Sequence, residues 1–201
     1  GCLFILPGCW DIKDIEETNY VTATGIDYLQ KEKAYSIFAQ SLNFTYLSKV
    51  EGKSPSGKKS AFVGHATSPS LELAFTNLYR TAQWRTSWAH TSTLLLSEKA
   101  IKEQGGLFFW DLFTRHPDFR LSMYVFGTKE PIDKMMLLEP LYGGSPRQAI
   151  LKDPEKVYRQ QSEIKPIIMF DYGRQMTEPA QTVLLPSVGI DKEAWRDKDN
   201  F

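Results

Sequence analysis

A strand–helix–strand pattern between residues 89 and 128 constrains the fold more than any other part of this sequence. The predicted strand Ala89–Leu96 ends in three consecutive leucines, which is typical of a strand buried on both faces of a sheet. Ser97 can cap a helix over Glu98–Gln104, and a second strand is predicted over Leu121–Thr128. Because strands joined through a helix run parallel, we expect a parallel pair with a right-handed crossover.

The crossover is expected to contain two helices rather than one. Gly105-Gly106 breaks the helical pattern, and a second helix over Leu107–Arg115 stops before Pro117. Between the helix that precedes this unit and its first strand, Trp84 to Trp88 is predicted to turn the chain.

The first third of the chain predicts antiparallel strands. Tyr20–Asp27 is β-branched and alternating, and Ala34–Tyr46 places its apolar residues largely at one parity, so the two make a plausible antiparallel hairpin. Ala61–Ala66 reads as a third strand. We therefore predict an α/β (α+β) fold: a mixed β-sheet with an antiparallel N-terminal part and packed helices.

Three further helices and a last strand complete the prediction. Ser68 can cap a helix over Pro69–Gln83, with the proline in the first turn, where no N–H is needed. Pro131–Leu138 predicts a short helix, Asp153–Glu163 a polar one, and Thr182–Leu185 a final edge strand. The residues expected to be buried by the helices are Leu71, Phe75, Leu78, Ile101, Phe109 and Leu112.

Composition and charge narrow the function classes. The 201 residues carry 24 Lys plus Arg and 24 Asp plus Glu, so no basic field indicates a nucleic-acid partner. No apolar run approaches the ~20 residues that span a bilayer. The two cysteines, Cys2 and Cys9, exclude a disulfide framework and a cysteine-based metal site. His65, His90 and His116 are widely spaced and form no recognised metal motif.

The sequence shows no catalytic constellation. It lacks a Gly-x-Ser-x-Gly elbow, a phosphate loop and a dinucleotide glycine fingerprint. We therefore predict no catalytic residue, no cofactor and no metal, and a protein that is not an enzyme. Trp84, Arg85 and Trp88 could form an aromatic and cationic recognition patch, although a tryptophan-flanked turn packing on the core is the favoured interpretation. The Lys49–Ser60 loop could meet anionic headgroups, but a solvated loop is favoured.

The N-terminal residues carry the one specific functional signal. The apolar run Leu3–Leu6 precedes Gly8 and Cys9, as at the end of a bacterial lipoprotein signal, where the thiol receives a diacylglycerol and cleavage exposes the cysteine. A short apolar segment packing on the domain, with Cys9 a buried thiol, is the alternative. On the lipoprotein interpretation, residues 1–8 are a signal remnant, 9–19 a membrane-proximal linker, 20–190 one domain and 191–201 a linker to a second domain outside this sequence.

Ordered motifs along the chain resemble one family. These are Leu6-Pro7-Gly8-Cys9-Trp10-Asp11, Gly25-Ile26-Asp27, Trp88-Ala89-His90 with Ser97-Glu98-Lys99-Ala100, and Arg115-His116-Pro117-Asp118-Phe119-Arg120 before Tyr124-Val125. Their order and spacing resemble the C-subunit lipoproteins of nutrient germinant receptors, the Ger(x)C family of spore-forming bacteria. Pro7 departs from the family's pattern.

The resemblance implies a non-enzymatic subunit anchored through Cys9 to the outer face of the spore inner membrane. Its implied partners are two polytopic membrane subunits of the same receptor, and its implied role is nutrient-triggered germination. A small-molecule-binding surface lipoprotein and an extracytoplasmic enzyme with an unrecognised site are the alternatives.

Overall fold

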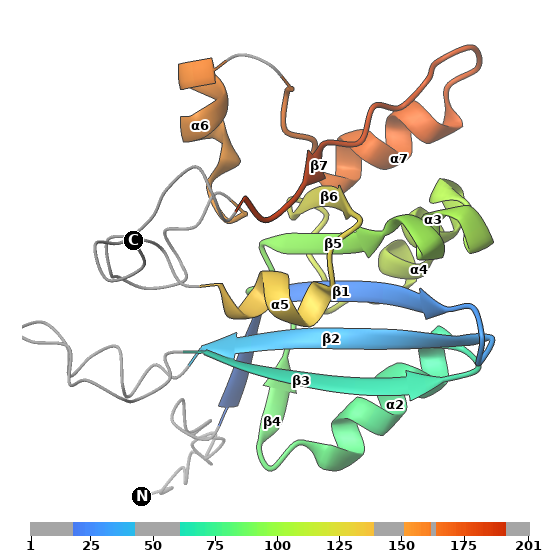
Figure 1. The fold of residues 1–201 in the computed structure, drawn as a ribbon, viewed down its shortest axis with the longest axis vertical. Coiled ribbons are helices and arrows are strands. Elements are labelled where there is room, and N and C mark those ends of the chain that lie inside the picture. The colour runs from blue at the N-terminus through green and yellow to red at the C-terminus, as the bar shows by residue number, and fades with distance from the viewer. Residues whose placement is uncertain (1–17, 43–60, 139–150, 162–163, 192–201) are drawn as a thin grey trace, which may run out of the picture.

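The computed structural model describes residues 18–42, 61–138, 151–161 and 164–191, and within them it contains seven strands and six helices (Figure 1). The strands are β1 (Thr18–Leu29), β2 (Ala34–Leu42), β3 (Ala61–Ser68), β4 (Arg85–Ser87), β5 (Thr93–Ser97), β6 (Tyr124–Thr128) and β7 (Ser187–Val188). The helices are α2 (Leu71–Thr81), α3 (Glu98–Gln104), α4 (Gly106–Arg115), α5 (Ile132–Leu137), α6 (Pro154–Gln161) and α7 (Met169–Thr177).

All the described strands join one mixed sheet, in the order β3-β2-β1-β5-β6-β7, with β4 also paired to β1. β1, β2 and β3 are antiparallel, whereas β4, β5, β6 and β7 continue from β1 in parallel. The predicted class, the N-terminal hairpin and the parallel pair β5–β6 are therefore confirmed. β1 is the junction of the two halves, since it pairs with β2 on one side and with β4 and β5 on the other.

The sheet separates two apolar cores. The main core gathers side chains from α2, α3, α4 and α7 on one face, and a smaller core gathers α5 on the other. Figure 1 shows α5 in front of the sheet and α2 behind β3. The leucine run of β5 serves both cores: Leu94 and Leu96 face the main one and Leu95 the smaller one, all fully buried. This confirms the predicted central position of the strand.

A register shift in β1 adapts the same strand to both cores. The pairing with β2 shifts between Val21 and Ala23, which is the signature of a β-bulge. Val21 consequently belongs to the main core and Ala23 to the smaller one, and beyond the shift Ile26 and Tyr28 return to the main core.

Helix ends agree in part with the predicted caps. Ser97 caps α3 by accepting a hydrogen bond from Ala100 N, and Gly105 ends that helix with a φ of 75°. The cap of α2, however, is Ser70 and not Ser68. Ser68 is the last residue of β3, where its hydroxyl donates to Thr67 O and accepts from Asn77 Nδ2, so it is not available to the helix.

Two predicted strands start later than expected. The strand predicted from Ala89 begins at Thr93, because Thr91 N donates to Trp88 O and closes a turn there. The strand predicted from Leu121 begins at Tyr124 after a similar Met123 N to Arg120 O hydrogen bond. Both delays come from local turns ahead of the strand.

Two predictions need correction, and one helix is unexpected. Thr182–Leu185 is not a strand; Val183 and Leu185 pack their side chains on the main core from irregular chain, and the strand is the short β7. Ile101 is only partly buried, whereas the other five residues predicted to be buried are buried in the main core. The sequence did not predict helix α7.

Candidate functional site

The end of the domain where β1 begins is the candidate site, because it is the described part of the chain nearest to Cys9 in sequence. Thr18 follows Cys9 by nine residues. Cys9 itself lies outside the described residues, as do Lys49–Ser60, the residues predicted as a signal remnant and most of the two predicted linkers. The described surface closest in sequence to Cys9 is therefore the one around the start of β1.

β4 builds this end together with β1. Thr18, Asn19 and Tyr20 pair in parallel with Arg85, Thr86 and Ser87. In Figure 1 the start of β1 and β4 extend together below β2 and β3. The sequence predicted only a turn here, because a three-residue strand has too little pattern to detect.

Trp84 and Trp88 do not form one recognition patch, because only Trp84 is exposed. Trp88 is 1% exposed; its ring centroid lies 5.4 Å from that of Phe75 and 5.1 Å from that of Phe119, and its Nε1 donates to Tyr79 Oη at 2.6 Å. Trp84 is 54% exposed. The favoured core-packing interpretation is thus correct for Trp88 and wrong for Trp84.

Other aromatic side chains share this surface. The ring of Tyr20 lies 5.0 Å from His90 in an edge-to-face contact, and Tyr20 pairs with Ser87 of β4. Tyr79 is 45% exposed although its hydroxyl accepts from Trp88. We call the set of surface residues made by Tyr20, Tyr79, Arg80, Trp84, Arg85 and His90 the aromatic end.

All residues of the aromatic end except Tyr20 come from a stretch without acidic residues. Residues 73–97 contain no Asp or Glu and two arginines, Arg80 and Arg85. Burial raises the pKa of Tyr79, and the hydrogen bond from Trp88 opposes this rise. The charge of Asp118, an acid on another loop nearby, raises the pKa of Tyr79 further. The acid-free stretch is the sequence signal that could have identified this end.

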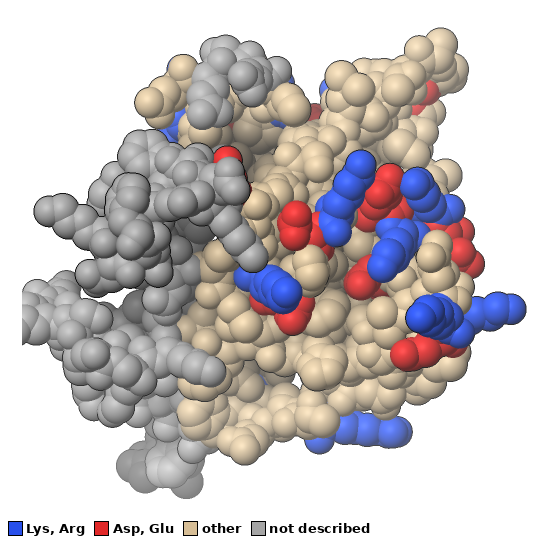
Figure 2. Space-filling model, in the orientation of Figure 1, with Lys and Arg blue, Asp and Glu red and all other residues tan. Residues whose placement is uncertain are grey.

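The opposite end of the parallel strands carries charges of both signs. Lys102 Nζ lies 2.8 Å from Glu98 Oε1 on α3, and this hydrogen bond, with the charges of Lys102 and Lys129, lowers the pKa of the Glu98 carboxyl. Figure 2 shows basic and acidic groups intermingled over this side of the molecule. Exposed pairs of this kind contribute little to stability, and the mixture creates no field of one sign.

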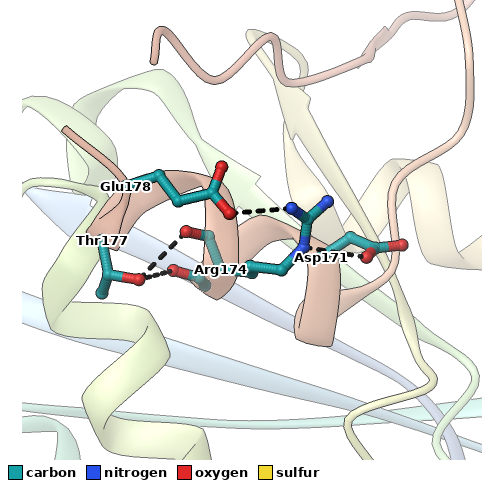
Figure 3. A network of polar contacts seen from close by, with 5 residues as sticks. Asp171, Arg174, Thr177 and Glu178 are labelled. Atoms are coloured by element: carbon teal, nitrogen blue, oxygen red, sulfur yellow. Dashed lines mark hydrogen bonds and ion pairs between the residues drawn. The ribbon is translucent and has the colours of Figure 1, made fainter. Parts of the chain in front are cut away.

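Helix α7 carries an exposed polar network of local contacts (Figure 3). Arg174 lies between Asp171, at 3.7 Å from Nε to Oδ1, and Glu178, at 2.8 Å from Nη1 to Oε1. The Thr177 hydroxyl donates to the carbonyls of Gly173 and Arg174. Each of these contacts joins residues three or four positions apart, so the network stabilises the helix by a few tenths of a kcal/mol per pair and indicates no site.

The histidines lie against aromatic rings rather than beside one another. His65 stacks on Phe38 with centroids 6.0 Å apart, and His116 lies 5.4 Å from Phe75. Among the described residues no group of three or more His, Cys, Asp or Glu could hold a metal ion. No helix in the described ranges is long and apolar enough to cross a membrane.

Comparison with known proteins connects the whole domain to one family. A family model described as "Spore germination protein N-terminal domain" matches residues 11–190. A curated relative, "Spore germination protein KC" of Bacillus subtilis (strain 168), is 25% identical over 121 residues, which cover 60% of this chain and 30% of the relative. The chain thus matches about a third of that relative's length. No solved structure matches.

Proposed function

The chain belongs to the family of spore germination protein N-terminal domains, and from this we propose that it is part of a C subunit of a spore germinant receptor, needed for nutrient-triggered germination. The family match over residues 11–190 is the observation that carries the proposal. The similarity to "Spore germination protein KC" supports it. The role is a non-enzymatic one, in assembly with polytopic membrane subunits of the same receptor.

The proposal includes a lipid anchor on Cys9 and a place on the extracytoplasmic face of the spore inner membrane. The apolar run before Gly8-Cys9 and the start of the family match at Asp11, two residues after the cysteine, support this arrangement. A single acyl chain holds a protein on a membrane only weakly, whereas two chains on one cysteine anchor it stably. The diacylglyceryl group on Cys9 would therefore suffice to retain the domain.

A cysteine-swap experiment tests the anchor and the function together. The full-length gene is expressed during sporulation with Cys9→Ala or, as the matched control, Cys2→Ala. We expect Cys9→Ala to leave the membrane fraction and to slow nutrient-triggered germination, and Cys2→Ala to do neither. Immunoblots of total spore protein separate mislocalisation from loss of the protein. Equal membrane retention and equal germination in both variants would contradict the anchor.

A further inference from the structure

We propose that the aromatic end rests on the membrane surface and binds anionic phospholipid headgroups, as a second, non-covalent contact beside the lipid on Cys9. This inference rests on the proposed anchoring, and it adds the orientation of the domain: the start of β1, β4 and the end of α2 face the lipid. The occupant is a phospholipid surface rather than a protein.

The length of the chain between Cys9 and the sheet supports this orientation. Nine residues reach at most about 30 Å when fully extended. A domain of about 180 residues has a radius of gyration of about 16 Å, so the tether is no longer than the domain is wide. Because Thr18 already pairs with Arg85, the aromatic end is the described surface that this tether holds nearest to the lipid.

The side chains at this end have the chemistry of the membrane interface. Trp and Tyr concentrate at the level of lipid headgroups, because their rings are apolar while the N–H and O–H groups stay wet. Trp84 exposes 54% of its surface although it is large and apolar, and Tyr79 exposes 45%. A membrane contact would remove this apolar area from water.

Two arginines at this end can bind the phosphate groups of an anionic surface. Arg80 and Arg85 are both exposed, and the 25-residue stretch 73–97 that contains them holds no acid. The acidic groups closest to them in the structure or the sequence are Asp118, whose charge acts on Tyr79, and the four acids of residues 11–17, which hold one lysine. Figure 2 shows basic atoms at the part of the lower edge that lies beneath α2.

Part of the contact surface is already held in a fixed conformation. Trp84 directly precedes β4, whose backbone is paired to β1, and Tyr79 accepts a hydrogen bond from Trp88. The Tyr79 side chain therefore has little entropy left to lose when the surface docks. A short tether gives an effective concentration in the millimolar range, so even a weak contact would set the orientation of an anchored domain.

Vesicle binding without the covalent lipid tests the inference directly. The full 201-residue chain carrying Cys9→Ser is sedimented with vesicles of phosphatidylglycerol and phosphatidylcholine, or of phosphatidylcholine alone. We expect binding to the anionic vesicles alone, weakened by salt. Trp84→Ala should lower the partition coefficient about tenfold, and Arg80→Gln with Arg85→Gln should lower it about fivefold per arginine. Trp84→Phe should keep most of the binding.

Matched controls come from other surfaces. Leu184→Ala removes an apolar side chain that is 77% exposed. The double variant Lys31→Gln with Lys99→Gln removes two exposed charges that both lie at the end of the sheet away from the aromatic end. These variants should bind as the Cys9→Ser chain does. Residues 43–60, which connect β2 to β3 and contain four lysines, stay unchanged throughout. Far-UV circular dichroism verifies that each variant is folded.

The outcomes separate this inference from the anchor. No binding to anionic vesicles, or binding that the aromatic-end variants leave unchanged, would overturn the inference while leaving the Cys9 experiment unaffected. Retention on spore membranes through a protein, with no binding to lipid vesicles, would overturn it as well. Vesicle binding that depends on Trp84 would support it even if Cys9→Ala proved harmless in spores.

Discussion

Replacing Gly173 by alanine tests how α7 docks on the domain. Gly173 lies in the middle of the helix, and a Cβ built on it would fall on the indole ring of Trp110 in α4. The ring therefore packs directly on the backbone of α7 at this point, and there is no space for a methyl group unless one helix shifts or the ring turns away.

Two opposing effects determine how much Gly173→Ala changes the free energy of unfolding. Overpacking a well-packed contact costs about 1 to 3 kcal/mol, while replacing a helical glycine by alanine gains up to about 1 kcal/mol of helix propensity. We expect Gly173→Ala to lower the free energy of unfolding by about 1 to 2 kcal/mol. In a Trp110→Ala background the clash disappears, so the same substitution should raise stability by up to about 1 kcal/mol.

Urea denaturation followed by far-UV circular dichroism measures this difference. Wild type, the two single variants and the double variant form a double-mutant cycle with a coupling energy of about 1 to 3 kcal/mol. The m-value should stay constant if all four unfold in two states. If Gly173→Ala stabilised the wild-type protein as much as it stabilised Trp110→Ala, the Trp110 ring would not pack on the backbone of α7.

Three further predictions concern individual buried groups. The Thr24 hydroxyl is buried without a hydrogen-bond partner among the described residues, so Thr24→Val should raise the free energy of unfolding by about 1 kcal/mol in urea titrations. Ser97→Ala should lower it by about 1 kcal/mol through loss of the α3 cap, measured in the same way. Burial raises the pKa of Tyr172 to about 12 from its usual 10, so the native state holds this proton more tightly than the unfolded chain. Stability should therefore fall as pH rises from 10 through 12, and Tyr172→Phe should lack this part of the fall in denaturation measured at each pH.

Sequence reasoning succeeded where the signal is local. The leucines of β5, the Ser97 cap and the Gly105 break each show in a few neighbouring residues, and together they specify the β5–α3–α4–β6 unit. The hairpin of β1 and β2 follows in the same way from alternation. These elements are correct because propensity, capping and burial all favour the same structure.

Prediction from the sequence failed where tertiary contacts determine the structure. Helix α7 has no side-chain cap at Ile168 and contains Gly173, both of which disfavour a helix, and it forms where Trp110 packs against it. Thr182–Leu185 looks like a strand, yet its apolar side chains are used in packing without pairing. The aromatic end was identified only in part, because nothing local distinguishes exposed Trp84 from Trp88, which Tyr79 and Phe119 enclose.

Affinity purification of the full-length protein from spore membranes, with mass spectrometry of everything retained, tests the central proposal most directly. We expect that polytopic receptor subunits are retained and that the peptide beginning at Cys9 carries the mass of a diacylglyceryl group. An unmodified Cys9 and a protein that leaves the membrane without partners would contradict the proposal of a lipid-anchored receptor subunit.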